Sequence, residues 1–159
     1  METIRWVQDT GFATWIRESS WAIFAFLIVH TISMGFLVGT GLAVDARVVG
    51  LGKRIPLPAI GRALPIMAIA VLFAVPSGVL LLIAYPAKAL TNPLFYVKLT
   101  LVVAALAITV ALNRRVFALA LAEPPAWARG LAGLCLVFWI SALTAGKFLE
   151  YTHHVLLVY

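Results

Sequence analysis

Residues 21–44 read WAIFAFLIVHTISMGFLVGTGLAV, a stretch in which His30 is the only titratable side chain. A transmembrane helix needs about 20 mostly apolar residues. Its backbone groups must bond within the segment, because hydrocarbon offers them no partner. This stretch therefore predicts a membrane-spanning α-helix, and three stretches of similar character follow at 63–83, 93–112 and 128–148. The predicted fold class is all-α, a polytopic membrane four-helix bundle that forms a single domain over 1–159.

The composition points the same way. The chain has 159 residues, of which 64% are hydrophobic and 11% charged, whereas a soluble domain is roughly half apolar and about a quarter charged. Too few charged side chains remain to cover a water-facing surface, so we expect lipid to contact much of the protein. The single cysteine, Cys135, cannot build a disulfide framework. The net charge of +6 requires no nucleic-acid partner, because basic loops can contact anionic lipid headgroups.

The first 20 residues differ from a removable signal peptide. They carry charges of both signs and scattered apolar residues, whereas a signal peptide has a basic start and an unbroken apolar stretch. Trp6, Trp15 and Trp21 are spread along this segment, and tryptophan concentrates at membrane–water interfaces. We therefore expect 1–20 to form an interfacial helix.

Lysine and arginine are divided unequally between the two sides of the predicted bundle. Seven belong to the first and third loops and five to the other side. Cytoplasmic loops carry an excess of these residues, so we expect the first and third loops in the cytoplasm. Both termini would then face outward, toward the periplasm, and the predicted location is a bacterial inner membrane.

Two proline positions predict local features of the helices. Asn92 followed by Pro93 is typical of a helix start, with asparagine as the cap and proline at the first helical position. Pro76 lies inside the second predicted helix. It predicts a kink near Ser77 and Gly78 that exposes a carbonyl group.

His30 is the sharpest functional candidate. It lies about nine residues into the first predicted helix, with apolar neighbours on both sides, at a depth of roughly 13 Å. Ionisable residues at membrane depth are costly, which makes each one a functional candidate. A neutral imidazole suits haem iron or another metal ion. The alternatives are a structural histidine bonded to a neighbouring helix and a proton relay.

A polar stripe ends the fourth predicted helix. Lys147, Tyr151 and His154 are spaced four and three residues apart, which places them on one helical face beside Glu150. Lys98, about five residues into the third helix, could extend to the interface, pair with Glu150, or contact a quinone or a haem carboxylate. The cofactor-binding candidates are His30, His154, Lys98 and Lys147, all in the outward half, and His30 is also the metal-ligand candidate. An interfacial collar is the alternative for the stripe.

Asp45 and Arg47 end the first predicted helix at its cytoplasmic side. We expect a structural ion pair here, with Arg62 as the candidate partner of Asp45. The alternative role for Asp45 and Arg47 is contact with a partner protein or a lipid headgroup, and the same role is open to Glu150 and Tyr151 at the other side.

Haem b held between two histidines would require His30 and His154 to lie at similar depth. On a straight antiparallel helix His154 lies some 11 residues beyond the level of His30, roughly 16 Å higher. One flat macrocycle cannot bridge that separation unless the C-terminal tail folds back. The second ligand could instead come from another subunit or another residue type.

Several motifs together form a family-like pattern. They are Trp21, His30-Thr31, Val38-Gly39, Asp45-x-Arg47-x-x-Gly50, Asn92-Pro93-x-Phe95-x-x-Lys98, Trp139 and Gly146-Lys147. The pattern resembles a bacterial family of four-helix inner-membrane proteins without assigned function. More distantly, the chain is similar to CopD-type copper-resistance proteins and small b-type cytochrome-like membrane proteins, which implies metal or haem handling. The family pattern has Gly-Arg where this chain has Gly146-Lys147. Lysine keeps the positive charge but lacks the paired N–H donors of a guanidinium group.

We therefore predict an integral membrane subunit of a bacterial assembly, either an electron-transfer subunit that carries haem b or an anchor subunit. The alternatives are a purely structural subunit without a cofactor and a small metal or solute transport component. The expected partners are the lipid bilayer, other membrane subunits or further copies of the chain, and a quinone. A stand-alone enzyme is disfavoured, because the sequence lacks a nucleophile–base pair, a phosphate loop and an HExxH motif.

Overall fold

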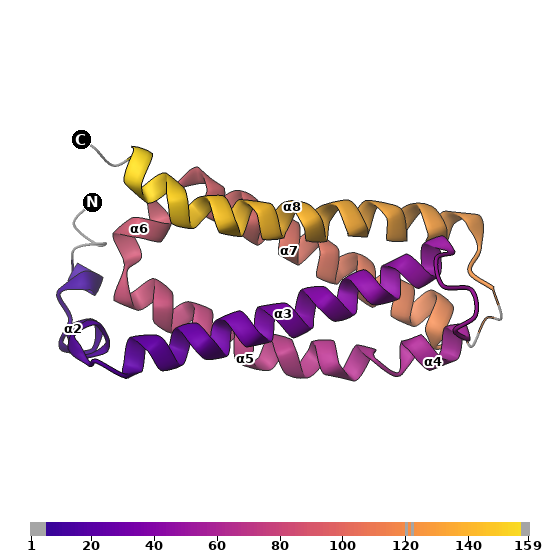
Figure 1. Cartoon of the computed structure of the whole chain (residues 1–159), viewed down its shortest axis with the longest axis horizontal. Helices are drawn as coiled ribbons and strands as arrows, with labels where there is room; N and C mark the ends of the chain where they lie inside the picture. The colour runs from indigo at the N-terminus through magenta and orange to yellow at the C-terminus, as the bar shows by residue number, and fades with distance from the viewer. Residues whose placement is uncertain (1–5, 120, 122, 157–159) are drawn as a thin grey trace.

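The structure is a computed structural model that describes residues 6–119, 121 and 123–156, with the backbone alone for 150 and 152–156. Four long helices run along the long axis of the molecule (Figure 1). They are α3 (Ala22–Val49), α5 (Leu64–Ala84), α7 (Pro93–Leu112) and α8 (Ala126–Leu156). All four belong to segments that are long and apolar enough to cross a membrane. The predicted all-α fold with four candidate membrane spans is confirmed.

Short helices lie at the two ends of the bundle. They are α2 (Gly11–Glu18), α4 (Leu57–Gly61), α6 (Pro86–Leu90) and η1 (Asn113–Phe117), of which η1 is a π-helical turn that continues α7. The first and last described residues lie at the end that carries α2 and α6, here named the termini end (Figure 1). The opposite end, with α4 and η1, is named the loop end.

The observed helix boundaries agree best with prediction where the sequence contains an explicit cap. The Asn92 side chain accepts a hydrogen bond from the Leu94 amide at 3.0 Å, and Pro93 is the first helical residue. By contrast, α3 continues five residues beyond the predicted end. It stops at Gly50, whose φ of 120° is accessible to glycine and costly for other residues. Helix α8 starts two residues earlier than predicted and continues to Leu156.

The long helices pack as two pairs. Helix α3 packs mainly against α5 and α7 mainly against α8, while a contact between α3 and α8 joins the pairs. The central core contains Leu37, Val38, Met67, Ala70, Ala105, Cys135 and Trp139. Large apolar side chains also point outward, including Phe24, Leu72 and Val103 at 63%, 68% and 58% exposure. Such a surface is suited to lipid rather than water.

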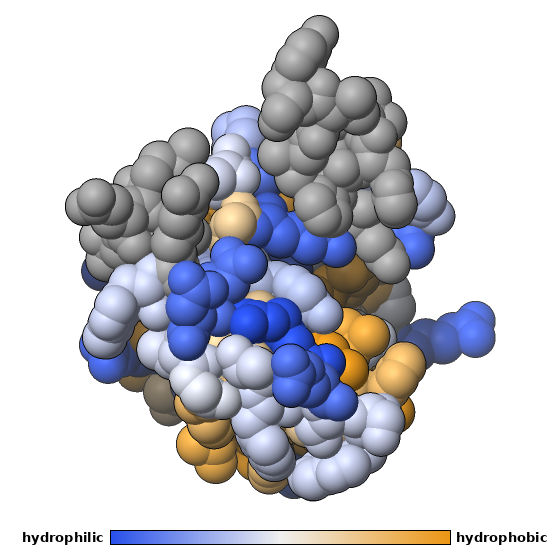
Figure 2. Space-filling view, turned by 90° about the vertical axis from the view of Figure 1, so that its left-hand side faces the viewer, coloured by the Kyte–Doolittle hydropathy of each residue, from blue (hydrophilic) through white to orange (hydrophobic). Residues whose placement is uncertain are grey.

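The termini end combines a short amphipathic helix with exposed polar groups. Helix α2 begins at Thr10, whose side chain accepts a hydrogen bond from the Ala13 amide. Arg17 donates to the carbonyl of Ala84 at 3.1 Å and so fastens α2 to the end of α5. Phe12 stacks on Trp15, which meets Trp21 edge to face. Figure 2 shows hydrophilic side chains gathered over this end and hydrophobic surface at its sides.

Candidate functional site

His30 lies near the termini end of α3 and is bonded to α5. Its Nδ1 lies 3.1 Å from the carbonyl oxygen of Ala74 and 3.2 Å from the hydroxyl oxygen of Ser77. The side chain is partly buried. The predicted membrane-depth histidine therefore contacts a neighbouring helix through both a carbonyl and a hydroxyl group.

The surrounding hydrogen bonds fix which ring nitrogen carries the proton. A carbonyl oxygen can only accept, and the Ser77 hydroxyl donates to the Phe73 carbonyl at 2.6 Å. Nδ1–H must therefore be the donor, and in the neutral ring Nε2 keeps its lone pair. An unprotonated ring nitrogen of this kind can serve as a hydrogen-bond acceptor or as a metal ligand.

The helix that faces His30 is adapted to the imidazole. Pro76 lies inside α5 as predicted, and proline removes one backbone donor from the helical ladder. A Cβ atom at Gly78 would stand 3.0 Å from Cε1 of His30 and 3.4 Å from Nδ1. Gly78 thus gives the imidazole room to lie against the backbone of α5.

Lys98 of α7 contacts α8 near the same end of the bundle. Its side chain runs along Gly146 of α8, where an added Cβ would stand 3.3 Å from Cε and 3.4 Å from Nζ. The termini end therefore holds two polar contacts between helices. One joins α3 to α5 at His30, Ser77 and Gly78, here named the His30 centre, and the other joins α7 to α8 at Lys98 and Gly146.

The predicted stripe on α8 is visible in part. The Lys147 ammonium lies 5.1 Å from the centre of the Tyr151 ring, and both side chains are exposed. The side chains of Glu150 and His154 lie outside the described residues. The backbone of α8 remains helical through Leu156, so the fold-back that pairing of His30 with His154 would require does not occur over this stretch.

Asp45 lies in a different environment from the one we expected. It is 0% exposed, as are Cys135 and Trp139, its polar neighbours on α8. Neither carboxyl oxygen has a hydrogen-bond partner among the described residues, and the same holds for Nε1 of Trp139. The expected ion pair with Arg62 is wrong, because Arg62 is exposed at the loop end while Asp45 is enclosed by helices. The register of α3 against α8 turns Asp45 inward.

Glycine makes room for the indole beside Asp45. A Cβ on Gly41, one helical turn before Asp45, would stand 2.6 Å from Nε1 and 2.7 Å from Cε2 of Trp139. Arg47, by contrast, points outward and donates from Nε to the Ile55 carbonyl. Sequence reasoning missed this inner cluster, although Gly41 with Asp45 and Cys135 with Trp139 are both spaced by four residues, as helical neighbours are.

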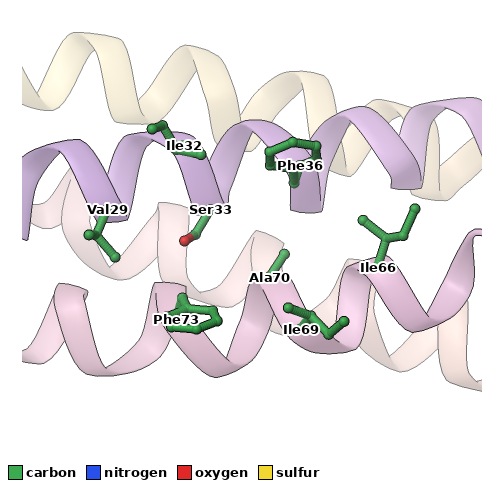
Figure 3. A pocket seen from close by; sticks show the side chains of 8 residues that line it. All are labelled: Val29, Ile32, Ser33, Phe36, Ile66, Ile69, Ala70 and Phe73. Atoms are coloured by element: carbon green, nitrogen blue, oxygen red, sulfur yellow. The ribbon is translucent and has the colours of Figure 1, made fainter.

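An apolar groove lies on the flank of the bundle between α3 and α5 (Figure 3). Its volume is about 390 Å³, and it is lined by Val29, Ile32, Ser33, Phe36, Ile66, Ile69, Ala70 and Phe73. Figure 3 shows Val29 and Ser33 extending from α3 toward α5, and Ile66 and Ala70 extending from α5 toward α3. The groove shares α3 and α5 with the His30 centre, but none of the residues of that centre lines it.

The described residues bring together no group of three or more histidine, cysteine, aspartate or glutamate side chains. No protein-family model, no curated protein and no solved structure matches the chain. The resemblance to a bacterial four-helix family therefore stays a prediction. Fold and surface define the class: a multi-pass integral membrane protein with four candidate membrane-spanning helices packed as a bundle.

Proposed function

We propose that the chain is the membrane subunit of a redox assembly and that His30 ligates the iron of haem b. The observation that carries the proposal is the hydrogen bonding of Nδ1. Because Nδ1–H is held by the Ala74 carbonyl and the Ser77 hydroxyl, Nε2 is the free ring nitrogen. Such a fixed tautomer is what iron ligation through imidazole requires.

The neighbouring cations fit the same proposal. Lys98 of α7 lies at the same end of the bundle as His30 and contacts Gly146 of α8, which Lys147 follows. Both ammonium groups would offer positive charge to the carboxylates of the macrocycle. When bound, haem would supply one-electron transfer, while the protein orients the ligand and limits access of water.

A second axial ligand is not provided by a histidine whose side chain is described, since His30 is the only one. We propose that it comes from another subunit or another residue type, which suits a component of a larger assembly. A quinone within the membrane is the electron donor or acceptor that such a subunit would serve.

The experiment is a visible absorption spectrum of the protein purified in detergent after expression with sufficient haem. We expect a Soret band that is lost in His30→Ala and retained in Thr31→Ala, the adjacent residue on the exposed side of α3. Circular dichroism of both variants checks that the helices are intact. Absence of the band in the wild-type protein would overturn the proposal.

A purely structural subunit is the second candidate, because the same two hydrogen bonds fasten α3 to α5 beside Pro76. Co-purification of stable partner subunits without a chromophore would favour it. The third class, a small transport component, would be favoured by changes of metal tolerance on deletion that depend on both His30 and Lys98.

A further inference from the structure

The loop end of the bundle carries an excess of exposed cations. Lys53, Arg54, Arg62, Arg114, Arg115 and Arg129 are all exposed. Of the two acids between residues 45 and 129, Asp45 is buried and Glu123 lies 3.6 Å from Arg129. Among the described residues, five exposed cations of this end therefore have no acidic side chain in ion-pair contact.

Local packing brings three of these arginines onto adjoining segments. Gly61 of α4 lies against the ring of Phe117, whose Cδ1 atom would be 2.7 Å from a Cβ at this position. Arg62 follows Gly61 directly, and Arg114 and Arg115 belong to η1, the turn that ends in Phe117. Beneath them, Leu57 and Val116 belong to one buried cluster. The three guanidinium groups thus start from segments that are packed on each other.

Large apolar side chains are interleaved with the cations. Leu51, Ile55 and Leu119 are 63%, 48% and 65% exposed, and Trp127 is 44% exposed. Leu51, Ile55 and Leu119 lie just outside the candidate membrane spans, and Trp127 lies at the start of one. Aliphatic side chains beside basic ones, with an indole at the same level, are typical of segments that lie in the headgroup region of a membrane.

We propose that this basic face, centred on Arg62, Arg114 and Arg115, binds the headgroups of anionic phospholipids in the adjoining leaflet. The planar guanidinium group offers paired donors that match phosphate oxygens. Anionic lipid attracts basic segments next to membrane spans. An acidic protein segment is the competing partner, but it would leave the exposed Leu51, Ile55 and Leu119 in water, whereas a lipid headgroup layer covers them.

The test uses the full chain in nanodiscs made from phosphatidylcholine mixed with phosphatidylglycerol. Mass spectrometry of the released protein–lipid complexes gives the ratio of the two lipids bound. We expect phosphatidylglycerol to be enriched on the wild-type protein. Since each arginine near a charged surface contributes up to about fivefold, the combined variant Arg62→Gln, Arg114→Gln and Arg115→Gln should lower the enrichment by up to about a hundredfold.

Two controls keep the outcome specific. Lys88→Gln removes a cation at the termini end. Arg129→Gln combined with Glu123→Gln removes an ion pair and leaves the net charge unchanged. Neither should change the enrichment more than about twofold. The single variants Arg114→Gln and Arg115→Gln, at exposed positions, serve if the triple variant does not fold. Equal enrichment in the wild-type and arginine variants would overturn the proposal, as would an acidic protein that stays bound in phosphatidylcholine alone and is released by the arginine variants.

Discussion

Helix α3 carries two titratable side chains that face other helices of the bundle, and they lie in opposite environments. His30 is partly buried, and its Nδ1–H has two acceptors on α5. Asp45 is 0% exposed, and neither of its oxygens has a hydrogen-bond partner among the described residues. The first group links two helices through satisfied bonds. The second costs free energy, because a buried polar group without a partner loses its interaction with water.

The difference arises from the helix that each residue faces. Near the termini end, α3 faces the part of α5 that contains Pro76 and Ser77, where carbonyl and hydroxyl oxygens are available. Near the loop end it faces α8, where a bulky indole lies against Gly41. Nδ1–H of His30 has acceptors within reach, which suits a binding site. The carboxyl group of Asp45 is enclosed between helices, which suits a role in setting the helix register or in holding a ligand.

Among the variants that test this comparison, Gly41→Ala should change the free energy of unfolding most. The new methyl group would stand 2.6 Å from Nε1 of Trp139, and the indole is fully buried and rigid, so α3 and α8 must move apart. We expect the free energy of unfolding in detergent to fall by about 1–3 kcal/mol.

The matched control for Gly41 is Gly39 on the same helix. A Cβ at Gly39 meets no atom within 4 Å, so Gly39→Ala should leave the stability unchanged or slightly raised. If both variants were destabilised equally, the close packing of α3 on α8 would be wrong.

Asp45→Asn is expected to have the next largest effect, in the opposite direction. Asparagine keeps the shape of the side chain but carries no charge to bury. We therefore expect the free energy of unfolding to rise by about 1 kcal/mol, measured by thermal unfolding in the same detergent. Asp45→Ala, which leaves a cavity, is the comparison variant. A loss of stability in both variants would show that the carboxyl group holds a ligand or a cation, and the contrast with His30 would disappear.

The hydrogen bond between His30 and Ser77 should contribute less to stability than the changes at Gly41 and Asp45. In a double-mutant cycle of His30→Ala and Ser77→Ala we expect a coupling of about 0.6 kcal/mol, typical of hydrogen bonds between membrane helices. Thr144→Ala is the control, because its hydroxyl bonds only to the Ile140 carbonyl of its own helix at 2.9 Å. A cycle with Thr144 in place of Ser77 should give no coupling, and a coupling of similar size there would argue for a nonspecific effect of losing a hydroxyl.

The sequence predicts the helices of this protein better than the surroundings of its polar residues. Length and hydropathy locate the four spans, and Asn92-Pro93 locates the start of α7, because these signals are local. Whether Asp45 faces lipid, water or another helix depends on the register of α3 against α8, which no local signal encodes. The pairing of small Gly41 with large Trp139 is likewise visible only after the helices are packed. His30 could be identified because an ionisable residue in an apolar run stands out, but its partners on α5 could not.

Gly78→Ala should change the free energy of unfolding least, because two contributions to stability oppose each other. Alanine stabilises a helix interior by roughly 0.5–1 kcal/mol relative to glycine. In the wild-type protein, however, its Cβ would stand 3.0 Å from Cε1 of His30, so the ring must shift and the gain is offset. In a His30→Ala background the imidazole is absent, and Gly78→Ala should then stabilise by the full amount. Thermal unfolding of the four proteins in the cycle measures the difference. An equal effect in both backgrounds would mean that the imidazole does not lie against α5, and the argument for a free Nε2 would lose its geometric basis.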